Sequence, residues 1–361
     1  MTILHVSTPA SWRGGEQQVA YLVNALLDKG IDQVVLTIER SALSKRLMEE
    51  DIPVTTFISR GFMDIHVAKK ISSLCQDKTF DIIHCHDSHA HSAAVMAASF
   101  FGNKVPIIVS RRVDFPVSGN PLSKWKYNHP LVKQIICVSD TIRSITVPAI
   151  RDKNKLVVVH SGIDLSKYQS STPPRILHEE LGLPATTKIV GNLSALADHK
   201  DYPTFIRTAA AVLASDPNVQ FVIAGTGPEE KKIKKMIRDL KLEDNIHILG
   251  FRDDPVTVMQ SLDVFLITSV TEGLGTIVLE AFAAGVPVVA TRAGGIPEMV
   301  IDEETGLLTE TRDVEALSKA VLRVLNNPIL HHDLVTNALV KVQGFSYEVT
   351  AERTLEIYKT V

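Results

Sequence analysis

The sequence predicts an α/β protein made of two doubly wound halves. Short apolar runs rich in β-branched residues alternate with longer helical patterns over most of the 361 residues, and this alternation indicates βαβ units around parallel sheets. The length is enough for about two domains. A polar stretch with paired prolines, YQSSTPPRI at residues 168–176, is typical of a boundary between them.

The elements of the first half follow one another in regular alternation. Buried strands are predicted at ILHV, QVVLTI, DIIHCH, PIIVS and KQIICVS. Amphipathic or apolar helices are expected after WRGGE and at AHSAAVMAASFF. Because doubly wound sheets bind ligands at the carboxyl ends of their strands, the loops that follow these strands are the predicted sites of chemistry.

The second half repeats the pattern. Strands are predicted at KIVGNLS, VQFVIAG, NIHILG, DVFLITS and VPVVAT, and helices at TIVLEAFAAG, DVEALSKAVLRVLNN and SYEVTAERTLEIYKTV. The last of these helices is expected to pack back on the first half.

The composition excludes several classes of protein. A net charge of −3 with 45% hydrophobic and 22% charged residues is ordinary for a soluble globular protein, and it gives no general attraction to nucleic acid. Cys75, Cys85 and Cys137 are scattered, so no disulfide framework is predicted. The N-terminus lacks a signal-peptide pattern, and no apolar run approaches the roughly 18 residues of a membrane span. We expect a cytoplasmic protein, at most peripheral at the inner face of the membrane.

Two carboxylates flank a glycine-containing turn in TEGLGTIVLEAFAAG, residues 271–285. A helix that begins near Gly275 or Thr276 would present free backbone N–H groups to an anion such as a phosphate. Glu280, about one turn inside that helix, is placed to accept hydrogen bonds from a ribose diol, and Glu272 lies in the loop before it. The spacing predicts a nucleotide sugar; a solvated loop acid and a surface helix acid are the alternative.

Several further segments occur in a fixed order. With TEGLGTIVLEAFAAGVPVVATRAGGIPEMV, the segments DIIHCHDSHAH, IICVSD, VVHSGIDLSKY, IAGTGPEE and GFRDD resemble family-4 glycosyltransferases, the glycosyl transferases group 1. The resemblance implies retaining enzymes of the GT-B fold, with two Rossmann-like domains facing a central cleft. It implies an acceptor-side domain at residues 1–165, a nucleotide-sugar-binding domain at 166–342, and a C-terminal helix at 343–361 that packs back on the first domain.

The resemblance also assigns a phosphate-binding lysine. Lys200, in the loop of GNLSALADHKDY, matches it, and a lysine there places a point charge on a diphosphate. The arginine that the family usually has five or six residues earlier is replaced by Ser194 and Ala195. Arg252 is a possible substitute, with a salt bridge to a neighbouring aspartate as the alternative.

A glycine loop follows the first strand. By resemblance, Gly15 borders the distal phosphate of the donor and Gly14 the acceptor, whereas a plain structural turn is the alternative. The loop is neither a Rossmann nor a P-loop fingerprint, which argues against dehydrogenases and P-loop nucleotidases.

The stretch HCHDSHAH contains His84, His86, His89 and His91 together with Asp87. Imidazole with carboxylate suits zinc, so a metal-dependent hydrolase that uses the cluster from His84 to His91 is one hypothesis. By resemblance, His86 instead faces the transferred sugar at a strand end and no metal is bound.

Basic residues suggest two further contacts. Arg111, Arg112 and Asp114 follow a strand and are fit to bind an acceptor with phosphate or carboxylate groups, with a salt-bridged loop as the alternative. The basic helix at residues 228–242 suits either acidic lipid headgroups or water.

These observations predict a retaining glycosyltransferase of the hexosyltransferase type. It would move a sugar from a nucleotide-sugar donor to a cell-envelope glycan or lipid-linked saccharide, with Lys200, Glu272 and His86 as catalytic residues. No cofactor beyond the donor and no nucleic-acid partner is expected. The missing arginine leaves a non-catalytic nucleotide-binding scaffold as the main alternative.

Overall fold

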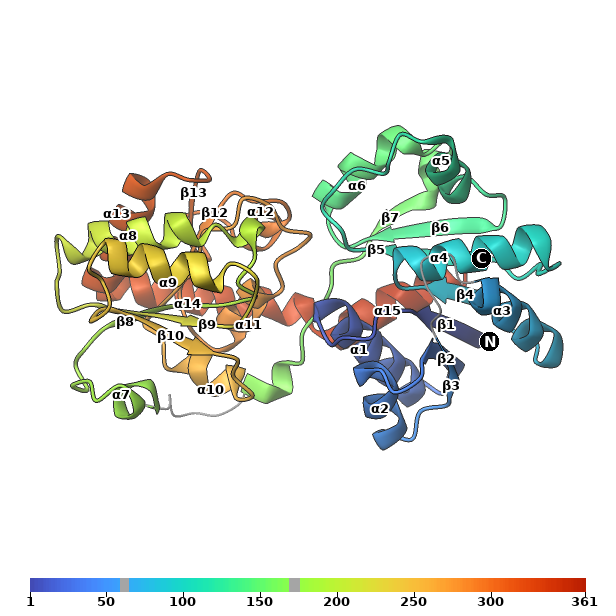
Figure 1. Ribbon diagram of the computed structural model, residues 1–361, viewed down its shortest axis with the longest axis horizontal. Coiled ribbons are helices and arrows are strands. Elements are labelled where there is room, and N and C mark those ends of the chain that lie inside the picture. The colour runs from blue at the N-terminus through green and yellow to red at the C-terminus, as the bar shows by residue number, and fades with distance from the viewer. Residues whose placement is uncertain (59–64, 169–175) are drawn as a thin grey trace. The chain divides into compact units, whose positions relative to one another are not determined.

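The computed structural model describes residues 1–58, 65–168 and 176–361. It divides into two compact units (Figure 1). Unit 1 comprises Met1–Gly162 together with Ser346–Val361, and unit 2 comprises Ile163–Phe345. The linker predicted at residues 168–176 lies, apart from its two end residues, outside the described part of the chain.

Unit 1 contains a seven-stranded parallel sheet in the order β3-β2-β1-β4-β5-β6-β7. The strands are β1 (Thr2–Ser7), β2 (Asp32–Ile38), β3 (Val54–Phe57), β4 (Ile82–Cys85), β5 (Ile107–Arg111), β6 (Val132–Cys137) and β7 (Leu156–Val158). The direction of winding reverses between β1 and β4, where His5 is the register partner of His84. The loops after these two strands therefore meet at the switch point where doubly wound sheets bind ligands.

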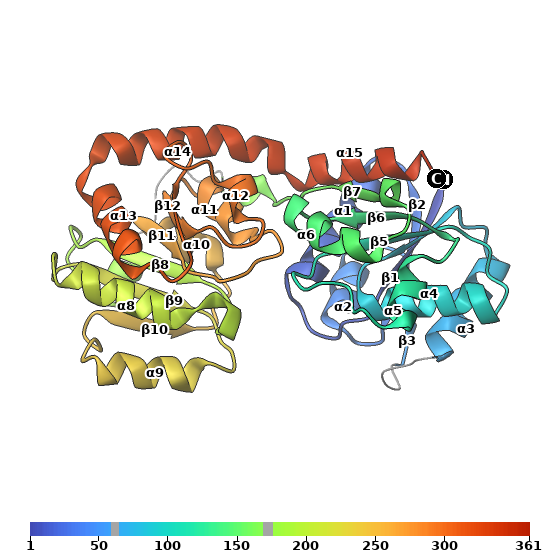
Figure 2. The same cartoon turned by 90° about the horizontal axis from the view of Figure 1, so that it is seen from above.

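Helices cover both faces of this sheet (Figures 1 and 2). They are α1 (Gly14–Asp28), α2 (Ala42–Glu49), α3 (Ile65–Asp77), α4 (Ser88–Phe100), α5 (Pro121–Tyr127), α6 (Asp140–Thr146) and α15 (Tyr347–Tyr358). Helix α15 comes from the far end of the sequence and packs on α1, where Ala351 and Tyr358 are buried with Ile3, Leu26 and Ile82. The last helix thus completes the core of unit 1.

Unit 2 contains a six-stranded parallel sheet in the order β10-β9-β8-β11-β12-β13. Its strands are β8 (Ile189–Leu193), β9 (Gln220–Ala224), β10 (Ile246–Gly250), β11 (Val264–Ile267), β12 (Val288–Thr291) and β13 (Leu307–Thr309). Its helices are α7 (Ile176–Glu180), α8 (Tyr202–Leu213), α9 (Glu230–Asp239), α10 (Pro255–Gln260), α11 (Ile277–Ala283), α12 (Ile296–Met299), α13 (Val314–Asn326) and α14 (Pro328–Val342). Here the winding reverses between β8 and β11.

The two sheets confirm the predicted fold class of two doubly wound α/β halves. Across the described residues, no helix combines the length and the apolar character that crossing a bilayer requires.

Candidate active site

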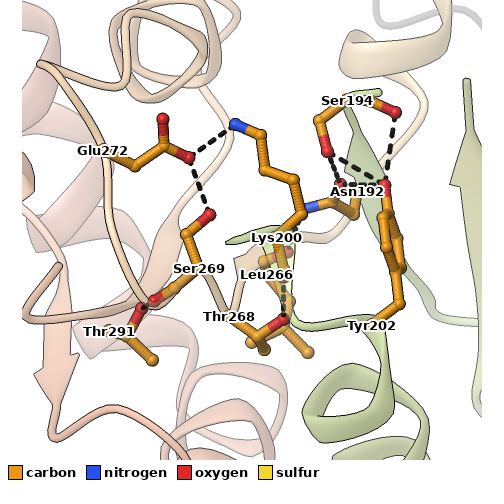
Figure 3. A network of polar contacts seen from close by, with 9 residues as sticks. All are labelled: Asn192, Ser194, Lys200, Tyr202, Leu266, Thr268, Ser269, Glu272 and Thr291. Atoms are coloured by element: carbon orange, nitrogen blue, oxygen red, sulfur yellow. Dashed lines mark hydrogen bonds and ion pairs between the residues drawn. The ribbon is translucent and has the colours of Figure 1, made fainter. Parts of the chain in front are cut away.

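The switch point of unit 2 brings Lys200 and Glu272 together. Lys200 ends a short 3-10 helix, η4 (Asp198–Lys200), that follows β8, and Glu272 lies in the loop after β11. Lys200 Nζ lies 2.5 Å from Glu272 Oε1, and Ser269 Oγ donates to the same oxygen at 2.7 Å (Figure 3). The side chains of Lys200 and Glu272 are only 13% and 9% exposed. The two residues predicted separately as catalytic therefore form one nearly buried ion pair.

Two threonine side chains hold this pair in place. Thr268 Oγ1, after β11, donates to the carbonyl oxygens of Lys200 and Asp201 at 3.1 and 3.2 Å. Thr291 Oγ1, at the end of β12, donates to the carbonyl of Ser269 at 2.6 Å. The loops after β8, β11 and β12 are consequently tied to one another, which restricts the ammonium and the carboxylate to one geometry.

A second contact to the Glu272 loop comes from a glycine pair after β12. Gly294 has a φ of +52°, and a Cβ added there would overlap the backbone oxygen of Glu272. Only glycine avoids both the strained conformation and the clash. Gly294 was not predicted as a site residue from the sequence, although a GG pair after a buried strand is a signal of close backbone approach.

The place of the missing arginine is occupied by neutral groups. Ser194 Oγ donates to Asn192 Oδ1 at 2.8 Å and lies 2.9 Å from the hydroxyl of Tyr202. Asn192 Nδ2 donates in turn to the carbonyl of Leu266 at 2.8 Å. Burial raises the pKa of Tyr202, so its hydroxyl stays neutral. This network fixes the end of β8 next to β11 without providing a positive charge.

Arg252 forms salt bridges, as the alternative interpretation of this residue predicts. Its guanidinium donates to Asp254 at 2.7 Å through two nitrogens, and to the two carboxylate oxygens of Glu180 at 2.9 and 3.0 Å. These bonds raise the pKa of Arg252. The carboxylates of Asp254 and Glu180 already neutralise the Arg252 guanidinium, which was one candidate to replace the missing arginine near Ser194.

Helix α11 begins within one or two residues of the start predicted from the sequence, near Gly275 or Thr276. Gly275 has a φ of +86°, and Thr276 precedes the first helical residue, Ile277. Because α11 has only 7 residues, its dipole is short, and Lys200 is the stronger source of positive charge for a phosphate.

Glu280 lies half-buried on α11. The hydroxyl of Tyr168, just after the start of unit 2, donates to Glu280 Oε2 at 3.2 Å. Burial raises the pKa of Glu280, which the bond from Tyr168 partly offsets. A carboxylate that accepts this one bond among the described residues keeps capacity to accept further hydroxyls.

In unit 1, His86 lies directly after β4 among two other histidines. Its Nε2 lies 2.9 Å from Nδ1 of His5, on β1. His84 contacts the hydroxyl of Tyr358 at 2.5 Å and Ser110 Oγ at 2.8 Å. Burial lowers the pKa of all three imidazoles, that of His5 to about 3, so the rings are neutral near pH 7.

The stretch HCHDSHAH does not converge on one point. His89 is exposed, and His91 is buried with its ring centroid 4.8 Å from that of Tyr127. Asp87 caps α4 through the N–H groups of His89 and Ala90 and also accepts two bonds from Thr8. The histidines that do come together are His5, His84 and His86, whose ligand atoms lie within 4.8 Å of one another. This trio contains no carboxylate, and both nitrogens of His84 already have partners.

The two arginines after β5 have different environments. Arg111 is buried, and it donates to Thr146 Oγ1 and the Tyr127 hydroxyl, each at 2.8 Å, and to the carbonyl of Phe115. These bonds hold the loop that carries half-buried Asp114. Arg112 donates to the carbonyl of His86 at 3.1 Å, and burial lowers its pKa to about 10.

The glycine loop after β1 lies in the same region. A Cβ at Gly14 or Gly15 would meet no heavy atom within 4 Å, so the start of α1 is open. Glu16 follows the two glycines, and its charge together with that of Asp87 opposes the lowering of the Arg112 pKa. The switch point of unit 1 thus gathers the Gly14–Gly15 loop, His86 and Arg112.

Two parallel sheets with polar residues at both switch points define a doubly wound α/β protein, and switch points are where such sheets usually bind ligands. Residues 12–167 match the family model of Glycosyltransferase Family 4, and residues 175–340 match that of Glycosyl transferases group 1. The chain belongs to this family of glycosyltransferases, which confirms the resemblance seen in the sequence.

Curated relatives are similar over most of the chain. N-acetyl-alpha-D-glucosaminyl L-malate synthase of Bacillus anthracis is 27% identical over 82% of this chain and 78% of its own length. The UDP-Gal:alpha-D-GlcNAc-diphosphoundecaprenol alpha-1,3-galactosyltransferase of Escherichia coli is 25% identical, with 79% and 76% covered. A D-inositol 3-phosphate glycosyltransferase of Corynebacterium glutamicum is 29% identical over 57% of this chain, and the chain spans about half (52%) of that relative.

Solved structures share the fold. A glycosyltransferase of Rickettsia africae superposes with a TM-score of 0.87 at 21% identity, covering 99% of this chain and 98% of the other. Anabaena HepE, solved with UDP and glucose, superposes with a TM-score of 0.86 at 21% identity, covering 99% of both chains. The fold is that of the GT-B glycosyltransferases.

Proposed function

We propose that this glycosyltransferase moves a sugar from a nucleotide-sugar donor to an anionic acceptor, with retention of the anomeric configuration. The observation that carries the proposal is the nearly buried pair of Lys200 and Glu272 at the switch point of unit 2. The arrival of a diphosphate would give Lys200 a new anionic partner. Glu272 would then be released to accept hydrogen bonds from the hydroxyls of the transferred sugar.

The site contains a suitable chemical group for each part of the donor and for the acceptor. Lys200 stabilises the negative charge that develops on the leaving diphosphate, the electrostatic contribution that is usually largest. The turn at Gly275 and Thr276 borders the phosphates, and Glu280 accepts from the ribose. In unit 1, neutral His86 faces the sugar and Gly15 the distal phosphate, while Gly14 and Arg112 contact the acceptor. Arg111 and Asp114 support that contact by shaping the loop after β5.

The substrates named for three relatives support an anionic acceptor. L-malate, D-inositol 3-phosphate and a diphosphoundecaprenol-linked sugar all carry negative charge. Arg112 offers a half-buried guanidinium for such a group. For a lipid-linked acceptor we propose peripheral contact at the cytoplasmic face of the membrane. Lys232, Lys234 and Lys235 of α9 form ion pairs with acids at residues 229–239. Within the described residues, the cations left for lipid headgroups on α9 and just after it are Lys231, Arg238 and Lys241.

We further propose that no metal cofactor takes part, because Lys200 supplies the positive charge at the leaving group. Transfer in the presence of EDTA should then equal transfer in its absence. A rate that collapses with EDTA and recovers with added Mg²⁺ or Zn²⁺ would contradict this assignment, and stoichiometric zinc in the purified protein would favour the hydrolase alternative.

Nucleotide binding tests the donor site directly. A ligand that binds only the native protein raises its Tm, so wild type and Lys200→Met are compared in UDP, GDP, ADP and CMP. We expect one nucleoside diphosphate to stabilise wild type and to lose most of this effect in Lys200→Met. The corresponding nucleotide sugar should then be hydrolysed or transferred. Stabilisation without any turnover would identify the non-catalytic scaffold instead.

A further inference from the structure

Large apolar side chains are exposed together on the segment after β5. Phe115 lies in the loop and is 61% exposed, and Leu122 and Trp125 on α5 are 65% and 41% exposed. Side chains three residues apart lie on the same side of a helix, so Leu122 and Trp125 form one apolar surface. An exposed surface of this kind marks a contact with a partner or a membrane more often than scattered single residues do.

A groove of about 330 Å³ lies beside Trp125. Lys124 and Arg151 line it together with the indole. The backbone N–H of Arg151 donates to Asn128 Oδ1 at 2.7 Å, and Asn128 Nδ2 donates to the carbonyl of Ala149 at 2.9 Å. These bonds tie the end of α5 to the segment before β7, so cations from two parts of the sequence are held at one groove.

Positive charge surrounds this groove. Within the part of the chain that the structure describes, no carboxylate forms an ion pair with Lys124 or Arg151. Asp152, the acid next to Arg151, instead caps the short 3-10 helix η2 (Lys153–Lys155). Residues 111–155 contain nine basic and three acidic residues, whereas the whole chain has a net charge of −3. This local excess of positive charge favours an anionic surface as the partner.

Helix α5 also lies next to the loop that follows β4. Lys126 Nζ donates to the backbone oxygen and to Oγ of Ser88 at 3.1 and 3.0 Å, and Ser88 begins α4 two residues after His86. Arg112, the proposed acceptor ligand, precedes the exposed segment. The apolar surface therefore borders the loops that would hold a lipid-linked acceptor; this link rests on the proposed function, whereas binding to a membrane is measured without it.

Helix α9, the other basic helix, offers charge without an apolar surface. Its apolar residues Ile233 and Ile237 are buried in the core of unit 2. Leu240, the residue after α9, is 43% exposed and stands alone there. Binding to an anionic bilayer uses cations for the headgroups and apolar side chains that enter the interface, and α5 provides both.

We propose that Phe115, Leu122, Lys124, Trp125 and Arg151, the α5 surface, bind an anionic lipid bilayer. Leu122 and Trp125 enter the headgroup layer, where an indole buries its apolar ring and keeps its N–H hydrated. The two cations contact lipid phosphates. This names the surface that makes the membrane contact included in the proposed function.

Fluorescence tests the contact at Trp125. The chain has two tryptophans, so Trp12→Phe leaves Trp125 as the only indole. On vesicles of phosphatidylcholine with about one-third phosphatidylglycerol, we expect its emission to move to shorter wavelength and its quenching by acrylamide to fall. Trp125→Phe reports Trp12 instead and should show neither change. A Trp125 emission that stays constant while the protein co-sediments with these vesicles, or a protein that does not co-sediment, would overturn the proposal.

Co-sedimentation with the same vesicles tests the charges. Lys124→Gln with Arg151→Gln should weaken binding about 30-fold at low salt, and Leu122→Ser about tenfold. Lys231→Gln with Arg238→Gln removes the same charge from α9 and should bind as wild type. Binding that is lost only in this α9 control, or that is unchanged in the α5 variants, would overturn the assignment.

Nucleotide binding separates this inference from the proposed function. The proposed donor site lies in unit 2, so the nucleoside diphosphate that stabilises wild type should raise the Tm of every α5 variant equally, which also shows that these variants fold. If the vesicle results hold but no nucleotide raises the Tm, the proposed function fails and the α5 surface stands. If a nucleotide raises the Tm but the protein ignores the vesicles, the α5 surface fails alone.

Discussion

At the scale of single residues, Lys200 and Glu272 have two expected functions: each neutralises the other when no donor is bound, and we propose that both act in catalysis. Removing one leaves a nearly buried charge without a partner, which destabilises the protein by on the order of 2 kcal/mol. We predict that Lys200→Met and Glu272→Gln each reduce turnover about 100-fold or more and each lower the free energy of unfolding.

The double variant separates these two functions. Lys200→Met with Glu272→Gln removes both charges, so it should regain part of the lost stability and none of the activity. Urea unfolding and transfer assays on the four proteins measure both quantities. Near wild-type rates in the two single variants would end the assignment of this pair.

Glu280 predicts a dependence of stability on pH. Burial raises the pKa of Glu280 above its ordinary value of 4.5, so the folded protein holds this proton to higher pH than the unfolded chain. The stabilisation is fully present below about pH 4.5 and is lost as the pH rises through the folded pKa. Glu280→Gln should therefore have a higher Tm than wild type at pH 7, and the difference should vanish below pH 4.5.

The control for that experiment is Glu356→Gln, at an exposed position on α15. It should follow the wild-type Tm at every pH. A Glu280→Gln variant that matches wild type at pH 7 would show that this half-buried carboxylate does not oppose folding.

The sequence predicted most of these residues but not their contacts. Lys200 and Glu272 are 72 positions apart, and only the adjacency of β8 and β11 brings them together; spacing along the chain does not encode strand order. For the same reason the sequence placed Arg111 and Arg112 together as acceptor ligands, although one is buried in a network of three bonds and the other contacts His86. His5 was missed because a single polar residue in an apolar strand has no pattern around it.

At the scale of elements, the loop after β12 fixes the loop that carries Glu272. We predict that Gly294→Ala lowers both Tm and turnover strongly, because its Cβ would overlap the backbone oxygen of Glu272 and displace that residue. Gly285→Ala is the matched control. Its φ of +71° is also left-handed, but its Cβ would approach only Val335, at 3.8 Å, so we expect a loss of about 1 kcal/mol with activity intact. Equal activity in both variants would contradict the close-approach argument.

The strands that the sequence pattern did not predict share a position in the fold. They are β3, β7 and β13, which lie at sheet edges and have 4, 3 and 3 residues. An edge strand pairs on one side only, so it folds with a shorter apolar run than a central strand. The central strands were predicted because burial on both faces requires a continuous apolar sequence.

At the scale of the whole molecule, unit 2 is one continuous segment, whereas unit 1 uses both ends of the described chain. The backbone N–H of Ile163 donates to the carbonyl of Phe345 at 2.9 Å, so the two ends of unit 2 lie side by side. We predict that residues 163–345 alone fold cooperatively and bind the same nucleoside diphosphate as the full chain. Circular dichroism and thermal shift with Lys200→Met as the control measure this.

Residues 1–162 alone should behave differently. Without α15, the apolar surfaces of α1 and of the central strands around Ile3 lose the cover of Ala351 and Tyr358. Adding a peptide of residues 346–361 in trans should increase the solubility and Tm of this fragment. A stable, soluble fragment that ignores the peptide would show that α15 is dispensable to unit 1.

The discontinuity of unit 1 has a consequence for biosynthesis. On the ribosome, the segment that finishes unit 1 emerges only after all of unit 2 has been translated, which reverses the usual order in which the N-terminal domain matures first. Until then, the apolar surface of α1 that α15 covers stays exposed to solvent, and we therefore expect chaperones such as holdases to recognise unit 1 during synthesis.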